Sequence, residues 1–166
     1  MSGAGENLPA ERFSGFYRLY WTRNEMRGGF PVPLYDFVND DVDPLTFHCA
    51  DGRLLRPASW FKDFDHGSVP GRLQGLVPAT CAPRAFVFHD SAFENHGHWV
   101  SKDGGKTWAF VELSQHQANH ILYRLMVVEG NSEATAWKAF AGVQVGGKEM
   151  WHKHTGPFPT CPGYGG

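Results

Sequence analysis

The sequence contains few cysteines and no arrangement that would pair them. Cys49, Cys81 and Cys161 are the three cysteines among 166 residues, and no Cys-x-x-Cys pair occurs. An odd number of cysteines without such a pair argues against a disulfide framework and against a cysteine zinc site. We therefore expect three reduced thiols.

An excess of charge of one sign and long apolar runs are also missing. The chain has fifteen basic and seventeen acidic residues, which gives a formal net charge of -2. Without a basic field the chain is not expected to bind nucleic acid. No run of about 18 apolar residues is present to span a bilayer, and Glu6, Glu11 and Arg12 lie where a signal peptide needs an apolar core. We expect no transmembrane segment and synthesis in the cytoplasm.

Apolar and aromatic residues are plentiful. Hydrophobic residues make up 42% of the chain and aromatic residues 14%, which is enough for one compact domain with a core. Residues 27–33 and 156–159 are rich in Gly and Pro, which interrupt strand ladders. We expect both ends to be extended arms or loops, and the aromatic residues between Phe13 and Phe37 to form either core strands or an interface.

Short apolar runs bounded by turn residues predict strands at 16–21, 34–38, 45–49 and 53–56. The last two form a predicted hairpin, because Asp51-Gly52 supplies the positive φ that a tight turn needs.

Apolar periodicity predicts three helices after residue 80. The first runs from Thr80 to Asn95 and turns His89 inward. The second begins at Ser114, which forms a capping box with Gln117, and ends before Gly130. The third begins at Asn131 or Ser132 and carries Ala136, Trp137 and Phe140 before Gly142 and Gly146-Gly147 end it.

These elements predict an α+β fold. We expect short N-terminal strands and arms over residues 1–44, and a core over residues 45–152. Its three helices span about 80–145, with a β-hairpin inserted at about 98–112. An extended Pro/Gly tail over residues 153–166 is expected to follow.

The inserted hairpin carries a motif of its own. The pattern SxDxGxTW is met by Ser101, Asp103, Gly105, Thr107 and Trp108. It resembles the Asp-box of sialidases and other propeller proteins, in which an aspartate closes a self-supporting turn. One copy predicts a hairpin and not a propeller, which would need several copies and far more chain.

A histidine and a carboxylate lie together within an apolar run. His89 and Asp90 belong to the run 86–93, and the segment Asp65-His66-Gly67-Ser68-Val69-Pro70 precedes it. Such groups are costly to desolvate unless something pairs with them. This region is therefore the predicted functional site.

The two segments resemble a bacteriophage and prophage family, the domain of unknown function number thirteen fifty-three, whose motifs run GFxTDxASVPR, HDxxY and ADxxF. Three polar positions differ: Phe93 replaces the motif tyrosine, Asn119 replaces the motif aspartate, and Gly71-Arg72 stands where arginine usually follows proline. The matching residues are Asp65, Gly67, Ser68, Val69 and Pro70 in the first motif, and His89 and Asp90 in the second.

This resemblance implies a phage protein made in the host cytoplasm. Together with the weakened polar motif, it leads us to expect a structural protein of the virion, in the tail or tail tip. It would act through assembly contacts with other phage structural proteins in a symmetric assembly. An intracellular phage accessory protein is a further alternative, because the family itself is uncharacterised.

A second resemblance implies an enzyme. The helix pair is similar to the arrangement of secreted calcium-dependent phospholipases. That scheme would make His89 the general base, Asp90 a calcium ligand and Asn119 the orienting group. However, asparagine cannot neutralise an imidazolium, and an Asp→Asn change at the orienting position of a serine-protease triad lowers turnover about ten-thousandfold. The alternative function is therefore an envelope-directed hydrolase with a weakened site.

Two further interpretations involve no such enzyme. Zinc could use histidine pairs at 96/98, 116/120 or 152/154, although none supplies a full tetrahedral set. No cofactor is predicted, and calcium and zinc stay open. In the interpretation that we prefer, His89, Asp90 and Asn119 form a buried hydrogen-bonded junction, Asp65 accepts backbone or His89 N–H groups, and Ser68 and Pro70 set the entry to the core.

Overall fold

A computed structural model describes residues 10–65, 81–148 and 151. The described residues form three helices and eight strands in two antiparallel sheets, which confirms the predicted α+β fold. Ser68 and Pro70 of the motif loop and the predicted tail at 153–166 lie outside the described residues.

The larger sheet has five short strands in the order β1-β4-β5-β7-β8. The predicted hairpin of β4 and β5 is confirmed, with Gly52 at φ 85° in its turn. The predicted insertion is confirmed as well, because β7 and β8 pair between the first two helices. The five strands are β1 (Arg12–Ser14), β4 (Thr46–His48), β5 (Leu54–Arg56), β7 (Gly97–Ser101) and β8 (Ala109–Glu112).

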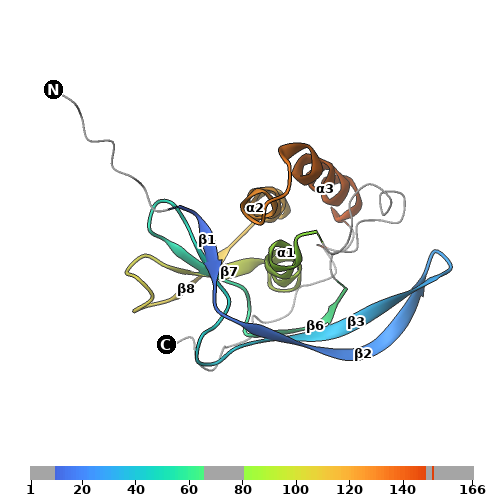
Figure 1. Cartoon of the computed structure of the whole chain (residues 1–166), viewed down its shortest axis with the longest axis horizontal. Helices are drawn as coiled ribbons and strands as arrows, with labels where there is room; N and C mark the ends of the chain where they lie inside the picture. The colour runs from blue at the N-terminus through green and yellow to red at the C-terminus, as the bar shows by residue number, and fades with distance from the viewer. Residues whose placement is uncertain (1–9, 66–80, 149–150, 152–166) are drawn as a thin grey trace.

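The smaller sheet is built on a long hairpin. Strands β2 (Tyr17–Arg27) and β3 (Phe30–Asn39) pair along their whole length, and β6 (Trp60–Phe64) adds to the inner half of β3. We refer to residues 17–39 as the ribbon (Figure 1). Our expectation that residues 27–33 form an arm or loop is wrong, since only Gly28 and Gly29 form the turn.

The prolines of the ribbon explain this error. Pro31 and Pro33 lie two residues apart, so their ring nitrogens face the same side of β3. Strand β6 pairs only with residues 35–38 of β3. Among the described strands, none pairs with the outer half of β3 on that side, and an unpaired edge is where a strand tolerates proline.

Local signals set the helix ends. Helix α1 (Pro83–Asn95) begins with proline at its start, where the missing N–H is not needed. Helix α2 (Gln115–Val128) has the predicted capping box of Ser114 and Gln117. Helix α3 (Glu133–Gly146) begins after Ser132, whose side chain accepts a hydrogen bond from the Thr135 N–H. Trp137 of this helix is 58% exposed.

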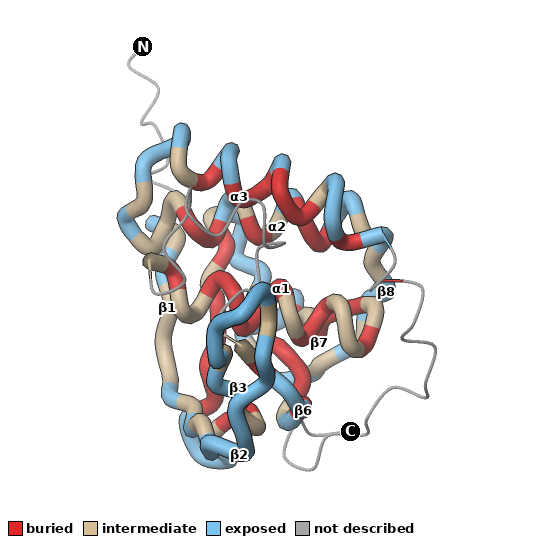
Figure 2. Tube along the Cα trace, turned by 90° about the vertical axis from the view of Figure 1, so that its right-hand side faces the viewer, coloured by how far each residue is buried: buried red, intermediate tan, exposed pale blue. Residues whose placement is uncertain are grey.

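The helices and the ribbon form layers. Figure 1 shows α1 between the β2-β3-β6 sheet on one side and α2 and α3 on the other. In Figure 2 the buried residues follow α1 along most of its length, whereas the ribbon is largely exposed. The core joins both sheets to the helices through fully buried side chains, the largest of which include Phe37, Phe47, Phe64, Phe86, Phe88 and Leu122.

Candidate functional site

His89 lies at the interface of α1 and α2. The apolar face of α1 turns it inward, and the residue is 5% exposed. Its Nε2 atom lies 2.9 Å from Oδ1 of Asn119, which is fully buried on α2. The predicted proximity of His89 and Asn119 is therefore present.

The sequence did not indicate a third member of this network. Asn119 Nδ2 donates a hydrogen bond to Gln144 Oε1 on α3, at 2.8 Å. This contact turns the amide so that Oδ1 faces His89, and Nε2 must then carry the proton of the imidazole. Gln144 follows the buried Ala136 and Phe140 at intervals of four residues, and this helical spacing could have indicated that Gln144 lies on the inner face of α3.

Asp90 faces the other nitrogen of the same ring. Its Oδ1 lies 3.4 Å from His89 Nδ1, and its side chain is 24% exposed. Burial raises the pKa of Asp90 to about 6; the hydrogen bond to His89 opposes this shift, and the charge of Asp65 adds to it. Because Nε2 already carries a proton, a hydrogen bond between Nδ1 and Asp90 needs one further proton shared by the pair.

Phe93 covers the imidazole where the phage motif has tyrosine. The two ring centroids are 4.4 Å apart, and Phe93 also meets Trp151 edge to face at 5.0 Å. The phenyl ring has no hydroxyl to offer to His89 or to a ligand. The surroundings of His89 are therefore more apolar than the motif implies.

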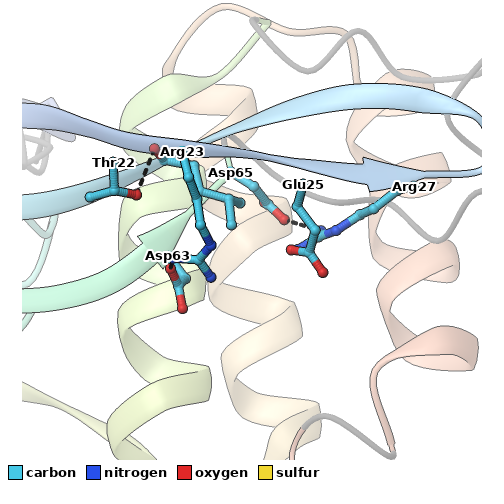
Figure 3. Close-up of polar contacts among 7 residues, drawn as sticks. Thr22, Arg23, Glu25, Arg27, Asp63 and Asp65 are labelled. Atoms are coloured by element: carbon cyan, nitrogen blue, oxygen red, sulfur yellow. Dashed lines mark hydrogen bonds and ion pairs between the residues drawn. The ribbon is translucent and has the colours of Figure 1, made fainter.

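Asp65 takes part in a contact that the sequence did not indicate. Arg27 Nη1 on β2 donates to Asp65 Oδ2 at 2.5 Å, and the Asp65 side chain is only 6% exposed. Figure 3 shows Arg27 and Arg23 reaching from the ribbon toward Asp65 and Asp63, with Glu25 beside Arg27. These ion pairs fasten the outer half of the ribbon to the end of β6.

The turn of the β7–β8 hairpin is closed by its own side chains. Asp103 accepts hydrogen bonds from the Ser101 hydroxyl and from the Thr107 N–H and hydroxyl, and these hold the pKa of Asp103 well below its usual range. Trp108 Nε1 donates to the Gly105 carbonyl. Gly105 also adopts φ 91°, which favours glycine. The five motif residues therefore stabilise the turn through their own contacts and dihedral angles.

The described residues contain no cluster of three His, Cys, Asp or Glu side chains placed to hold a metal ion. His96 and His98 turn apart, because their Nε2 atoms contact the carbonyls of Trp151 and Phe88. His116 and His120 do converge, with their Nε2 atoms 3.0 Å apart. His152 and His154 lie outside the described residues.

The ribbon is a second candidate site, on the surface. Its exposed fractions are 51% at Tyr20, 61% at Trp21, 66% at Met26 and 72% at Phe30. Large apolar side chains are frequent in protein interfaces, and several of them together on an exposed element mark a binding surface. No helix within the described ranges is long and apolar enough to cross a membrane.

Comparison with known proteins adds no relative. No family model matches the chain, no curated protein matches it, and neither does any solved structure. The resemblance to the phage family therefore stays a prediction that depends on its short motifs.

Proposed function

We propose that this protein is a structural component of a bacteriophage particle, in the tail or tail tip, and that it acts through assembly contacts of its ribbon. The assignment to a bacteriophage depends on the motif resemblance alone. The observation that carries the assembly role is the ribbon itself, a paired hairpin with large exposed apolar side chains. Side chains such as Trp21 and Phe30 bury large areas when a partner covers them.

The burial of His89 and its hydrogen-bond partners support a structural role over a catalytic one. His89 is 5% exposed and Asn119 is fully buried, and both imidazole nitrogens have protein partners. A general base must reach the proton that it removes, directly or through one water molecule. A network that holds three helices together needs no such access.

Quantitative mass spectrometry of gradient-purified particles tests the proposal. We expect the chain at a fixed ratio to the major capsid and tail proteins. Replacement of Trp21 and Phe30 by serine should remove it from particles, whereas the same change at Val42 and Val145 should not. The two valines are a matched control, because they are 93% and 82% exposed and lie outside the ribbon.

Either of two results would contradict the proposal. The wild-type chain could be absent from particles although the infected cell contains it, which would favour an intracellular accessory protein. Alternatively, the ribbon variant could enter particles as well as the control does. Circular dichroism of both variants establishes that they fold, so that a loss of incorporation reports a lost contact.

A phage-encoded envelope hydrolase is the second candidate, and Asp90 is the observation that favours it. A partly exposed carboxyl group with a pKa near 6, next to a histidine, has the acid–base properties that hydrolases use. His89→Ala separates the two functions. An enzyme would lose envelope hydrolysis and keep its fold, whereas a structural junction would lose about 1–3 kcal/mol of unfolding free energy.

A further inference from the structure

Two exposed histidines on α2 direct the same ring nitrogen toward each other. His116 and His120 lie one turn apart, and their Nε2 atoms are 3.0 Å apart. In each of the other described histidines, Nε2 contacts an oxygen atom of a different residue: Ser14 for His48, Asn119 for His89, Trp151 for His96 and Phe88 for His98.

The separation of the two nitrogens suits a metal ion. Metal–imidazole bonds of about 2.0–2.1 Å to both atoms would give an N–metal–N angle of roughly 90–97° at the observed spacing of 3.0 Å. This angle is close to that of neighbouring ligands in square-planar or octahedral geometry, and smaller than the tetrahedral angle of zinc sites.

The ring positions agree with this geometry. If a metal ion lay in both ring planes at those bond lengths, the two ring centroids would be about 4.7 Å apart. The centroids of His116 and His120 are 4.5 Å apart. A linear hydrogen bond between the rings would instead place the centroids about 5.3 Å apart, because the two rings would then point end to end. The two Nε2 atoms are thus directed toward one common point.

The surroundings hold the rings and leave that point open. Phe140 of α3 packs against both imidazoles, with centroids 4.8 Å from His120 and 6.0 Å from His116, and Trp137 stacks on Phe140 at 5.1 Å. This aromatic backing limits the rotamers of the histidines. Both histidines are exposed, so water can fill the remaining coordination positions.

We propose that His116 and His120 form a two-imidazole site for a divalent transition metal of tetragonal preference. Cu²⁺ is the first choice and Ni²⁺ the second, because imidazole sites bind these ions in that order and their geometry matches the angle. In the metal-free pair one Nε2–H donates a bent hydrogen bond to the other Nε2. Binding needs that ring to change tautomer, so its proton moves through water to Nδ1 and no net proton is released.

Titration of the full chain with Cu²⁺, followed by calorimetry and electron paramagnetic resonance, tests the site. We expect one equivalent to bind with two nitrogen ligands in the spectrum. His116→Ala and His120→Ala should each weaken this binding at least about tenfold, since loss of even a supporting residue outside the ligand set costs that much. Both positions are exposed, so the variants should keep the fold, which circular dichroism checks.

His152→Ala with His154→Ala is the matched control, because it removes two histidines that are also close in the sequence but lie outside α2. It should leave the affinity unchanged. The proposal is overturned if no Cu²⁺ binds, if the α2 variants bind as tightly as the wild type, or if only the control variant loses binding.

Discussion

The environment of Asp90 differs from that of an ordinary surface carboxylate. Desolvation is the main cause that raises its pKa from 3.8 to about 6, and the charges of Asp65 and Glu94 add to this shift. A group of this kind binds its proton more tightly in the folded state than in the unfolded state. It therefore makes stability depend on pH.

We predict the following pH dependence. Between about pH 4 and pH 6 the folded state holds the Asp90 proton more tightly than the unfolded state, so the contribution of Asp90 to the free energy of unfolding should fall as the pH rises, by roughly 2–3 kcal/mol. Burial lowers the pKa of His98 to about 4, which acts in the opposite direction over the same range, so the fall is read from the difference between the wild type and Asp90→Asn. Asp90→Asn should remove this fall and be more stable than the wild type at pH 8. Urea unfolding of both proteins from pH 4 to pH 8 measures the pH dependence of the free energy of unfolding. Asp41→Asn, at an exposed position, should retain the wild-type profile.

The His89 network shows which residue positions and contacts could be predicted from the sequence. The inward position of His89 and its meeting with Asn119 follow from helical periodicity, because each lies on an apolar face. Helical spacing could have placed Gln144 on the inner face of α3, but the contacts that Gln144 and Arg27 make could not be predicted. Their contacts depend on how α3 crosses α2 and how the ribbon bends over β6, and local sequence does not encode either angle.

At the scale of the elements, α1 receives its N-terminal cap from another helix. Ala82 precedes it and provides no side-chain cap, so the first N–H groups need another acceptor. Glu129, at the end of α2, accepts hydrogen bonds from the backbone N–H groups of Arg84 and Ala85, at 3.1 and 2.9 Å. Its side chain is only 4% exposed.

Glu129→Ala should therefore lower the free energy of unfolding by about 1–3 kcal/mol, because it leaves two backbone donors without an acceptor. Glu129→Gln keeps one acceptor oxygen and should lose less. Urea unfolding measures both, with Glu133→Ala on the exposed first turn of α3 as the control. Equal stability of the alanine variant and the wild type would show that water replaces the cap.

The two arginine contacts of the ribbon allow a matched comparison. Arg27→Leu removes the positive charge beside a carboxylate that is 6% exposed, whereas Arg23→Leu acts on Asp63, which is 46% exposed. We expect a loss of about 1–3 kcal/mol for the first change and at most about 1 kcal/mol for the second. Thermal unfolding at low and high salt measures both. A larger loss for Arg23→Leu would refute this ranking.

The elements could be predicted to different degrees for physical reasons. The starts of α2 and α3 were evident because Ser114 and Ser132 cap them locally. The outer half of β3 was missed because proline usually excludes a strand, whereas here no described strand pairs with β3 beside the two prolines.

At the scale of the whole molecule, the chain passes from one sheet to the other at Gly15. This residue adopts φ 82° between β1 and β2, and a Cβ atom there would lie 2.2 Å from the Pro44 carbonyl oxygen. The turn therefore requires glycine for two reasons, its dihedral angle and the close backbone. Glycine is the residue that meets both conditions.

Gly15→Ala should destabilise the protein by about 2 kcal/mol or more, because both sheets would have to shift. Gly29→Ala is the matched control, since Gly29 has φ 85° but no atom within 4 Å of its added Cβ. The control should lose only the dihedral cost of about 1 kcal/mol. Chemical denaturation of the two variants measures the difference, and equal losses would mean that the Pro44 contact relaxes freely.

The cap on α1 has a consequence for the order of events during synthesis. Glu129 lies 44 residues after Ala85, whose N–H group it accepts. At translation rates of about 5–20 residues per second, the ribosome needs roughly 2–9 s to make that stretch. Helix α1 thus leaves the ribosome with its first turn open, and its capped form exists only after α2 has emerged. The two helices consequently become stable together, as one cotranslational unit.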